Sequence, residues 1–384
     1  MARLGQTRGG EIQPVLKRLE AVATSPLRQI ATQLQCLLNP AALAYEAGLL
    51  PVDEFRELVR YADYVLSRLP QGFGTRFHFD AIQIAAIADD VGRDRFSGML
   101  IPRYERDWGH ESVMMPAENG SSHVIDLILM PGDEGVSHIN LLSYPWLGHE
   151  LAHNLLFRHD TTLSGDVSHE LKKVVQRLKI SSIADRGAAH AKATRLVDQF
   201  MLLWTPTPDH KNWAHEIAAD CVALWIFGPA YMACFEDLLE DPLLNPYELT
   251  QSHPPYSVRA NAILEGAQIL NWNDSRIQTA VAAWPVSKWR DAKSNQIRSL
   301  ASPELTSACV KAAFKICQTL GLARCTAERL DEILRGHGPD HTPEFGVNLV
   351  LEAYVAFEKT GDQAYRQWQE NVVRELAENV AITL

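Results

Sequence analysis

The sequence predicts a mainly helical α+β protein, and two patterns in the chain favour this fold class. Apolar residues recur at helical spacing over residues 1–70 and again from residue 145 almost to the end. Between residues 71 and 143 the pattern changes. Two β-rich runs flank the turn PGDEG in SHVIDLILMPGDEGVSHINLLSYP, which predicts a hairpin or two neighbouring strands. The expected architecture therefore combines many helices with one small β-sheet.

Three regions follow from these patterns. We expect a helical N-terminal region over 1–70, a core with the sheet and the chemical motifs over 71–270, and a helical C-terminal region over 271–384. The longest apolar run, CVALWIFGPAYMACF (221–235), has fifteen residues and an internal Gly-Pro pair. It is too short to span a membrane and predicts a buried pair of helices instead.

The composition limits the classes of partner and compartment. The net charge is −11, and no run of basic residues interrupts this acidic balance. Because nucleic-acid binding requires a basic surface, the composition argues against a nucleic-acid partner. The start of the chain has no apolar segment of signal-peptide length, so the expected compartment is the cytoplasm. The six cysteines form no C-x-x-C pair, which favours buried, reduced thiols.

The clearest chemical motif lies in YPWLGHELAHNLLFRHD, residues 144–160. Its H-E-x-x-H pattern places His149 and His153 four residues apart, and a helix brings such residues onto one face about 5–6 Å apart. Two imidazoles so placed bind one zinc ion at ~2.0–2.1 Å. Glu150 follows the first ligand, where its carboxylate is placed to accept a proton from a water activated by the metal. Pro145 is tolerated in the first turn of such a helix.

Catalytic zinc sites use three protein ligands, and the sequence offers two candidates for the third. The first is His159, which stands where the metzincin pattern H-E-x-x-H-x-x-G-x-x-H has its last histidine. However, Leu156 replaces the glycine that lets the metzincin chain turn back to the metal. In an uninterrupted helix His159 would lie about 15 Å from His149 along the axis, too far to share an ion.

Glu216 in NWAHEIAADCVALW is the second candidate. It stands four residues before Asp220, so both carboxylates lie on one face of a predicted second helix. There Glu216 would bind the metal, and Asp220 would accept the ring N–H of a ligand histidine and fix its tautomer. Apolar residues crowd in after Asp220, and buried acids need partners. His215 is expected to face elsewhere and is assigned no role.

The combination of these motifs resembles the gluzincin zinc peptidases, in which H-E-x-x-H is followed by a helical E-x-x-A-D. The long interval between the two motifs, followed by SHPPYSVRANAIL (252–264), is similar to the HtpX and CAAX prenyl protease family. The similarity covers about a third of the chain. It implies a zincin-like core with zinc bound by His149, His153 and Glu216.

The loop after the second helix is similar to the family's S/T-H-P motif, which has an arginine a few residues later. The matching residues are SHP at 252–254 and Arg259. The resemblance implies structural or transition-state roles around His253 and Arg259. A peptidase needs a donor for the tetrahedral oxyanion besides the metal, and His253 or Tyr256 could supply it. Arg259 is expected to pair with an acid such as Asp220.

We therefore predict a soluble zinc metalloendopeptidase that acts on protein or peptide substrates. The best-known members of the family are integral membrane proteins, whereas this chain has no predicted membrane span, so their membrane-bound substrates are not expected. Two alternatives remain: a regulatory or sensor protein on a peptidase scaffold, and a hydrolase of non-peptide amides. Iron, manganese or cobalt would also suit the ligand set. The C-terminal helical region is a candidate surface for a partner protein.

Overall fold

The computed structural model describes most of the chain from residue 38 onward. The described residues are 38, 39, 41–56, 58–60, 76–92, 98–105, 109–116, 122–131, 139–158, 160–183, 188–205, 212–240, 245–248, 253–272, 276–283, 300–336 and 343–383. Most of them are helical, which confirms the prediction of a mainly helical protein. Of the predicted N-terminal helical region only residues within 38–60 are described, and they are helical at 41–46 and in most of 52–60.

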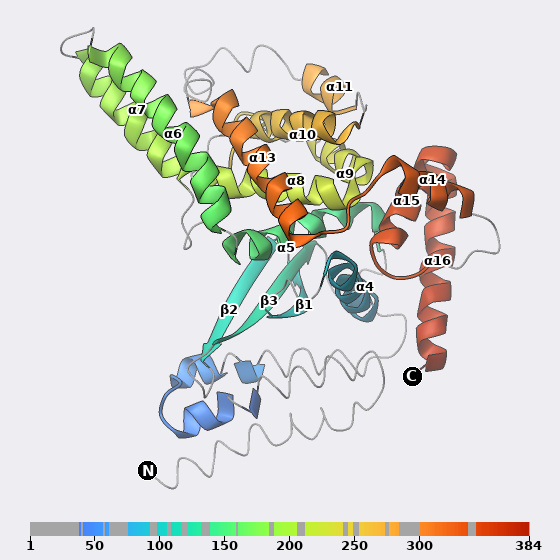
Figure 1. The fold of residues 1–384 in the computed structure, drawn as a ribbon. Coiled ribbons are helices and arrows are strands. Elements are labelled where there is room, and N and C mark those ends of the chain that lie inside the picture. Colours follow the sequence, from blue (N-terminus) through green and yellow to red (C-terminus); the bar gives the residue numbers. More distant parts are fainter. Residues whose placement is uncertain are drawn as a thin grey trace.

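The described part of the chain contains one three-stranded sheet. Its strands are β1 (Gly98–Glu105), β2 (Gly109–Pro116) and β3 (Ser122–Pro131). β3 is central, pairing in parallel with β1 and antiparallel with β2. Helix α4 (Arg76–Val91) packs against β1, and β2 contacts the helix that carries His149. The sheet therefore lies beside the histidine helix, as Figure 1 shows.

The predicted second β-rich run is wrong in its described part. Residues 132–138 lie outside the described residues, but Leu141–Ser143 form the 3-10 helix η2 instead of a strand. Two side-chain contacts stabilise this turn: Asn140 accepts a hydrogen bond from the Leu142 N–H (3.2 Å), and Gln369 accepts one from the Leu141 N–H (2.8 Å). The strand that pairs antiparallel with β3 is β2, which precedes it in the sequence.

The two predicted metal-binding helices both form. They are α5 (Pro145–Arg158) and α8 (Trp213–Phe227). α5 begins at Pro145, as predicted, because a proline in the first turn loses no helical hydrogen bond. α8 begins after Asn212, whose side chain accepts hydrogen bonds from the backbone N–H groups of Ala214 and His215. Every residue of α8 is buried, so this helix forms the centre of the core.

Two helices connect α5 to α8. They are α6 (Asp160–Ile183) and α7 (Ala188–Trp204), which pack against each other and form an arm that projects from the body in Figure 1. The arm is held at its base by α13 (Pro303–Leu320), which packs against both α6 and α8. The long interval between the two sequence motifs therefore folds as a helical pair, and residues of both helices, such as Leu163 and Trp204, belong to the hydrophobic core.

The apolar run over 221–235 forms a buried helix pair, as predicted. α8 ends at Phe227 and α9 (Pro229–Leu239) begins two residues later. Between them Gly228 has a φ of 52°, a backbone conformation that side chains resist. Among the described residues no helix is long and apolar enough to cross a membrane.

The C-terminal region is helical, as predicted, and packs on the core. α10 (Tyr256–Leu270) ends the predicted core region, and the described helices that follow it are α11 (Arg276–Ala283), α13, α14 (Ala327–Gly336), α15 (Val347–Thr360) and α16 (Asp362–Thr383). A single hydrophobic cluster includes residues of α5, α8, α13 and α15. Five cysteines are described, and all are buried and free, as expected; Cys36 lies outside the described residues.

Candidate metal centre

Close packing of α5 on α8 brings the two sequence motifs together. Gly148 faces α8, and a Cβ at this position would lie 2.8 Å from the Phe227 ring and 3.3 Å from the Cα of Ala223. No other residue type fits this contact without displacing Phe227, so the glycine permits the close approach. The neighbouring His149 and, one turn later, His153 then reach across to the acids of α8.

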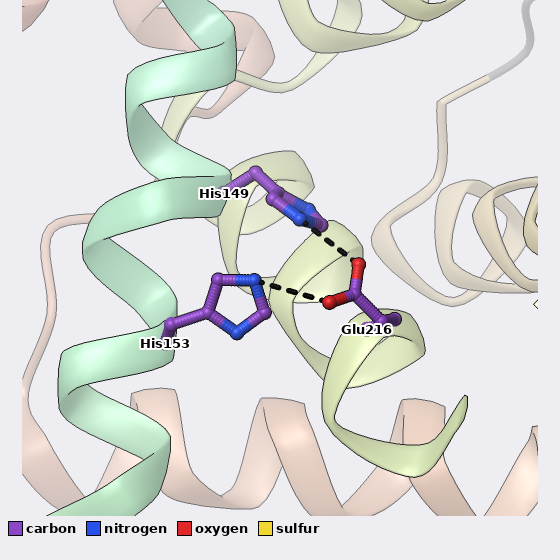
Figure 2. A group of neighbouring side chains, drawn as sticks. All are labelled: His149, His153 and Glu216. Carbon is purple, nitrogen blue, oxygen red and sulfur yellow. Dashed lines mark ion pairs between the residues drawn. The ribbon is translucent and has the colours of Figure 1, made fainter. Parts of the chain in front are cut away.

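The two histidines of α5 converge on Glu216 of α8 (Figure 2). His149 Nε2 lies 3.4 Å from Glu216 Oε2, and His153 Nε2 lies 3.4 Å from Glu216 Oε1. The ligand atoms of the three residues all lie within 4.8 Å of one another, and all three side chains are buried. This group could hold a metal ion.

The distances between the side chains are compatible with a bound zinc ion. Two ligands at ~2.0–2.1 Å from a tetrahedral zinc lie about 3.3–3.4 Å apart. Each histidine Nε2 lies at about this distance from one oxygen of Glu216, and the two histidines face different oxygens. Both oxygens of Glu216 are buried, yet neither makes a hydrogen bond within the described part of the chain. A buried carboxylate without hydrogen bonds is costly, and an ion between the three side chains would remove that cost.

Asp220 is satisfied by the protein itself. Its Oδ1 accepts hydrogen bonds from His149 Nδ1 (2.8 Å), from the Tyr231 hydroxyl (2.5 Å) and from Arg259 Nη2 (2.6 Å). Its Oδ2 accepts one from Arg259 Nε (2.8 Å). The predicted pairing of Arg259 with Asp220 is therefore observed. Because a carboxylate only accepts, the contact places a proton on Nδ1 of His149 and directs Nε2 toward Glu216.

The charges of these buried groups are strongly coupled. Burial alone would lower the pKa of His149, but the contacts with Asp220 and Glu216 outweigh it and raise the pKa to about 9. Burial alone would raise the pKa of Asp220, but the charge of Arg259 and its hydrogen bonds hold this pKa well below its usual range. The nearby histidines likewise outweigh burial at Glu216 and lower its pKa. Both acids are therefore ionised at neutral pH.

Glu150 lies on α5 between the two histidines of the motif. Its side chain is buried, and its Oε2 makes no hydrogen bond within the described residues. Glu150 follows His149 directly in the chain, which is the place of the general base in the H-E-x-x-H motif.

The structure also locates the remaining predicted residues. His253 is 54% exposed, with its Nε2 3.7 Å from Glu216 Oε1, so this side chain stands at the solvent side of the metal group. Tyr256 begins α10, is half-buried, and packs its ring 5.5 Å from the Arg259 guanidinium. His159 lies outside the described residues. α5 continues through Leu156 to Arg158, so it does not turn where metzincins have their glycine.

Two contacting residues were not singled out from the sequence. Tyr231 was seen only as part of an apolar run, and its hydrogen bond to Asp220 depends on the turn at Gly228 that folds α9 back on α8. Trp146 lies three residues before His149, and the two rings are in edge contact, with centroids 5.8 Å apart. The spacing of Trp146 was a usable signal, because residues three apart share a helix face.

Comparisons of the chain with protein-family models, with curated proteins and with solved structures find no match. The resemblance to gluzincin peptidases therefore stays a prediction from the sequence motifs.

Proposed function

We propose that the chain is a zinc-dependent metalloendopeptidase of the gluzincin type, built on a zincin-like core with a small β-sheet. The observation that carries the proposal is the convergence of His149, His153 and Glu216 from two helices, with Glu150 beside them. Two histidines, one carboxylate and a neighbouring free carboxylate are the groups that zinc hydrolysis of an amide requires.

Five residues have a chemical role in this proposal. His149, His153 and Glu216 would hold the zinc ion, and Asp220 keeps His149 in the tautomer that offers Nε2. When bound, zinc supplies Lewis acidity that polarises a carbonyl and lowers the pKa of a water. Glu150 would accept the proton of the attacking water and pass it to the leaving amine.

His253 is the stronger of the two candidates for stabilising the oxyanion. It approaches Glu216 from the exposed side, whereas the Tyr256 ring packs against Arg259 and Phe235. A donor on the solvent side could contact a substrate that reaches the metal from solution. Arg259, which is buried and paired with Asp220, would hold the site together instead of touching substrate.

The test is proteolysis of denatured casein by zinc-loaded protein, with and without Glu150→Gln. The amide cannot act as a base, so cleavage should fall at least about 100-fold while zinc content stays unchanged. Glu352→Gln is the matched control, because Glu352 is also buried but lies on α15. Zinc-loaded wild type that cleaves no protein would contradict the proposal and favour a regulatory metal site. Full activity in Glu150→Gln would contradict the role of Glu150.

A further inference from the structure

The Arg259 guanidinium lies among three aromatic rings. Its central carbon is 5.6 Å from the centroid of Trp146, 5.5 Å from that of Phe235 and 5.5 Å from that of Tyr256. All three distances are within the range of a cation–π contact. The rings come from α5, α9 and α10, so three helices together determine where the guanidinium lies.

Trp146 differs from the other two rings because it also touches a metal-ligand residue. Its ring is in edge contact with His149, and it stands on α5 one turn before that histidine. The ring also packs against Tyr231 and Phe235. Trp146 therefore contacts both ends of the chain of hydrogen bonds that runs from Arg259 through Asp220 to His149.

We propose that Trp146 is a positioning residue of the metal centre, whose ring holds Arg259 against Asp220 and so fixes the orientation of the His149 imidazole. The inference rests on the proposed metal site. It adds a supporting residue that lies outside the sequence motifs. The planar guanidinium must point both Nε and Nη2 at the two oxygens of one carboxylate. The Trp146 ring, which lies within cation–π distance of the guanidinium, limits its movement away from that orientation.

The molecule contains a second tryptophan–arginine pair that serves as an internal control. Arg324 lies 5.3 Å from the centroid of Trp225, and this arginine donates to the backbone oxygen of Leu270 instead of to an acid of the metal group. Trp225 is buried and donates its Nε1–H to Leu322. Loss of this pair should loosen the core without changing the orientation of His149.

The experiment measures zinc affinity by competition with a chelator for wild type, Trp146→Phe, Trp146→Leu and Trp225→Leu, and measures the unfolding midpoint of each metal-free protein. We expect Trp146→Leu to weaken zinc binding about 10-fold or more, the size of effect seen when support of a ligand histidine is lost. The zinc affinity of Trp146→Phe should lie between those of wild type and Trp146→Leu, because phenylalanine is a weaker cation–π partner than tryptophan. Trp225→Leu should lower the unfolding midpoint with zinc affinity within about twofold of wild type.

The outcomes separate this inference from the proposed function. A wild type that binds no zinc overturns both. A wild type that binds zinc, with Trp146→Leu within twofold of it, overturns the role of Trp146 alone. An equal loss of zinc affinity in Trp225→Leu also overturns that role, because it would reflect general loosening. If Trp146→Leu does not fold, Trp146→Phe is compared with wild type in its place. If Trp225→Leu does not fold, Arg324→Met is the control. Affinity in Trp146→Phe equal to wild type then overturns the role.

Discussion

Two acids one turn apart on α8, Glu216 and Asp220, are equally buried but have opposite surroundings. Asp220 accepts four hydrogen bonds from His149, Tyr231 and Arg259. Glu216 accepts none within the described residues and instead faces the Nε2 atoms of two histidines at 3.4 Å. On the same helix, one acid is thus held by hydrogen bonds, whereas the other only faces histidines and keeps its oxygens open to an added ion.

This difference distinguishes the acid that would bind the metal from the acid that supports a ligand histidine. The oxygens of Asp220 are already engaged by His149, Tyr231 and Arg259, so this acid would act on the metal through His149. A carboxylate without hydrogen bonds retains its lone pairs for coordination, so Glu216 is the ligand. Three changes test this contrast, in order of decreasing effect.

Removal of the Arg259 cation should have the largest effect on stability. In Arg259→Met the buried, ionised Asp220 would lose its arginine partner and two of its four hydrogen bonds, so unfolding in urea should show a loss of about 3–5 kcal/mol. The control is Arg177→Met, because Arg177 and Glu304 form an ion pair whose side chains are 58% and 48% exposed. Such pairs contribute about 0–1 kcal/mol. Equal losses in both variants would mean that the Asp220 network has no special role.

The pH dependence of the metal-free protein should show the coupling of His149 to both acids. The pKa of His149 is raised from 6.5 to about 9 by folding. A raised pKa stabilises the fold fully below 6.5, and that stabilisation is lost as the pH rises through 9. The difference corresponds to about 3 kcal/mol. Because a ligand imidazole must be neutral, zinc affinity should rise over the same interval.

Chelator-treated protein unfolded in urea from pH 6 to pH 9.5 provides the measurement. His149→Gln should show a flatter profile over this interval, because the glutamine side chain does not titrate. A wild-type profile as flat as that of the variant would mean that Asp220 and Glu216 do not hold a proton on His149.

Loss of one hydrogen bond to Asp220 should have the smallest effect. Tyr231→Phe leaves Asp220 with three of its four bonds, and a bond to a charged acceptor contributes about 1.5–3 kcal/mol. Tyr365→Phe is the control, because the Tyr365 hydroxyl donates to the neutral Gln369 at 2.6 Å and should contribute about 0.5–1.5 kcal/mol. Calorimetric unfolding compares the two. A larger loss in Tyr365→Phe would contradict the account of Asp220 as an ionised acceptor.

The parts of the site that the sequence predicts are those set by helical periodicity. Residues four apart on a helix share a face, so the sequence alone predicts the pairs on α5 and α8. Pro145 likewise marks the first residue of α5. The pairing of Arg259 with Asp220 followed from the need of a buried acid for a partner.

The parts that the sequence does not predict depend on contacts between distant residues. Leu141–Ser143 are apolar enough for a strand but form η2, with Gln369 accepting a hydrogen bond from residue 141 across 228 positions. The position of Tyr231 depends on the turn at Gly228, and the ring of Trp146 gains its role only when α9 and α10 pack beside it. No local pattern encodes such contacts.

The most direct test of the central claim is the metal content of the protein purified without added metal. Wild type, Glu352→Gln and His159→Ala should contain about one zinc per chain, and Glu216→Gln should contain less than about a tenth of that amount, because its amide replaces the ligand carboxylate. This result would establish Glu216 as the ligand that completes the site. Zinc retained in Glu216→Gln, or lost in His159→Ala, or absent from wild type, would contradict it.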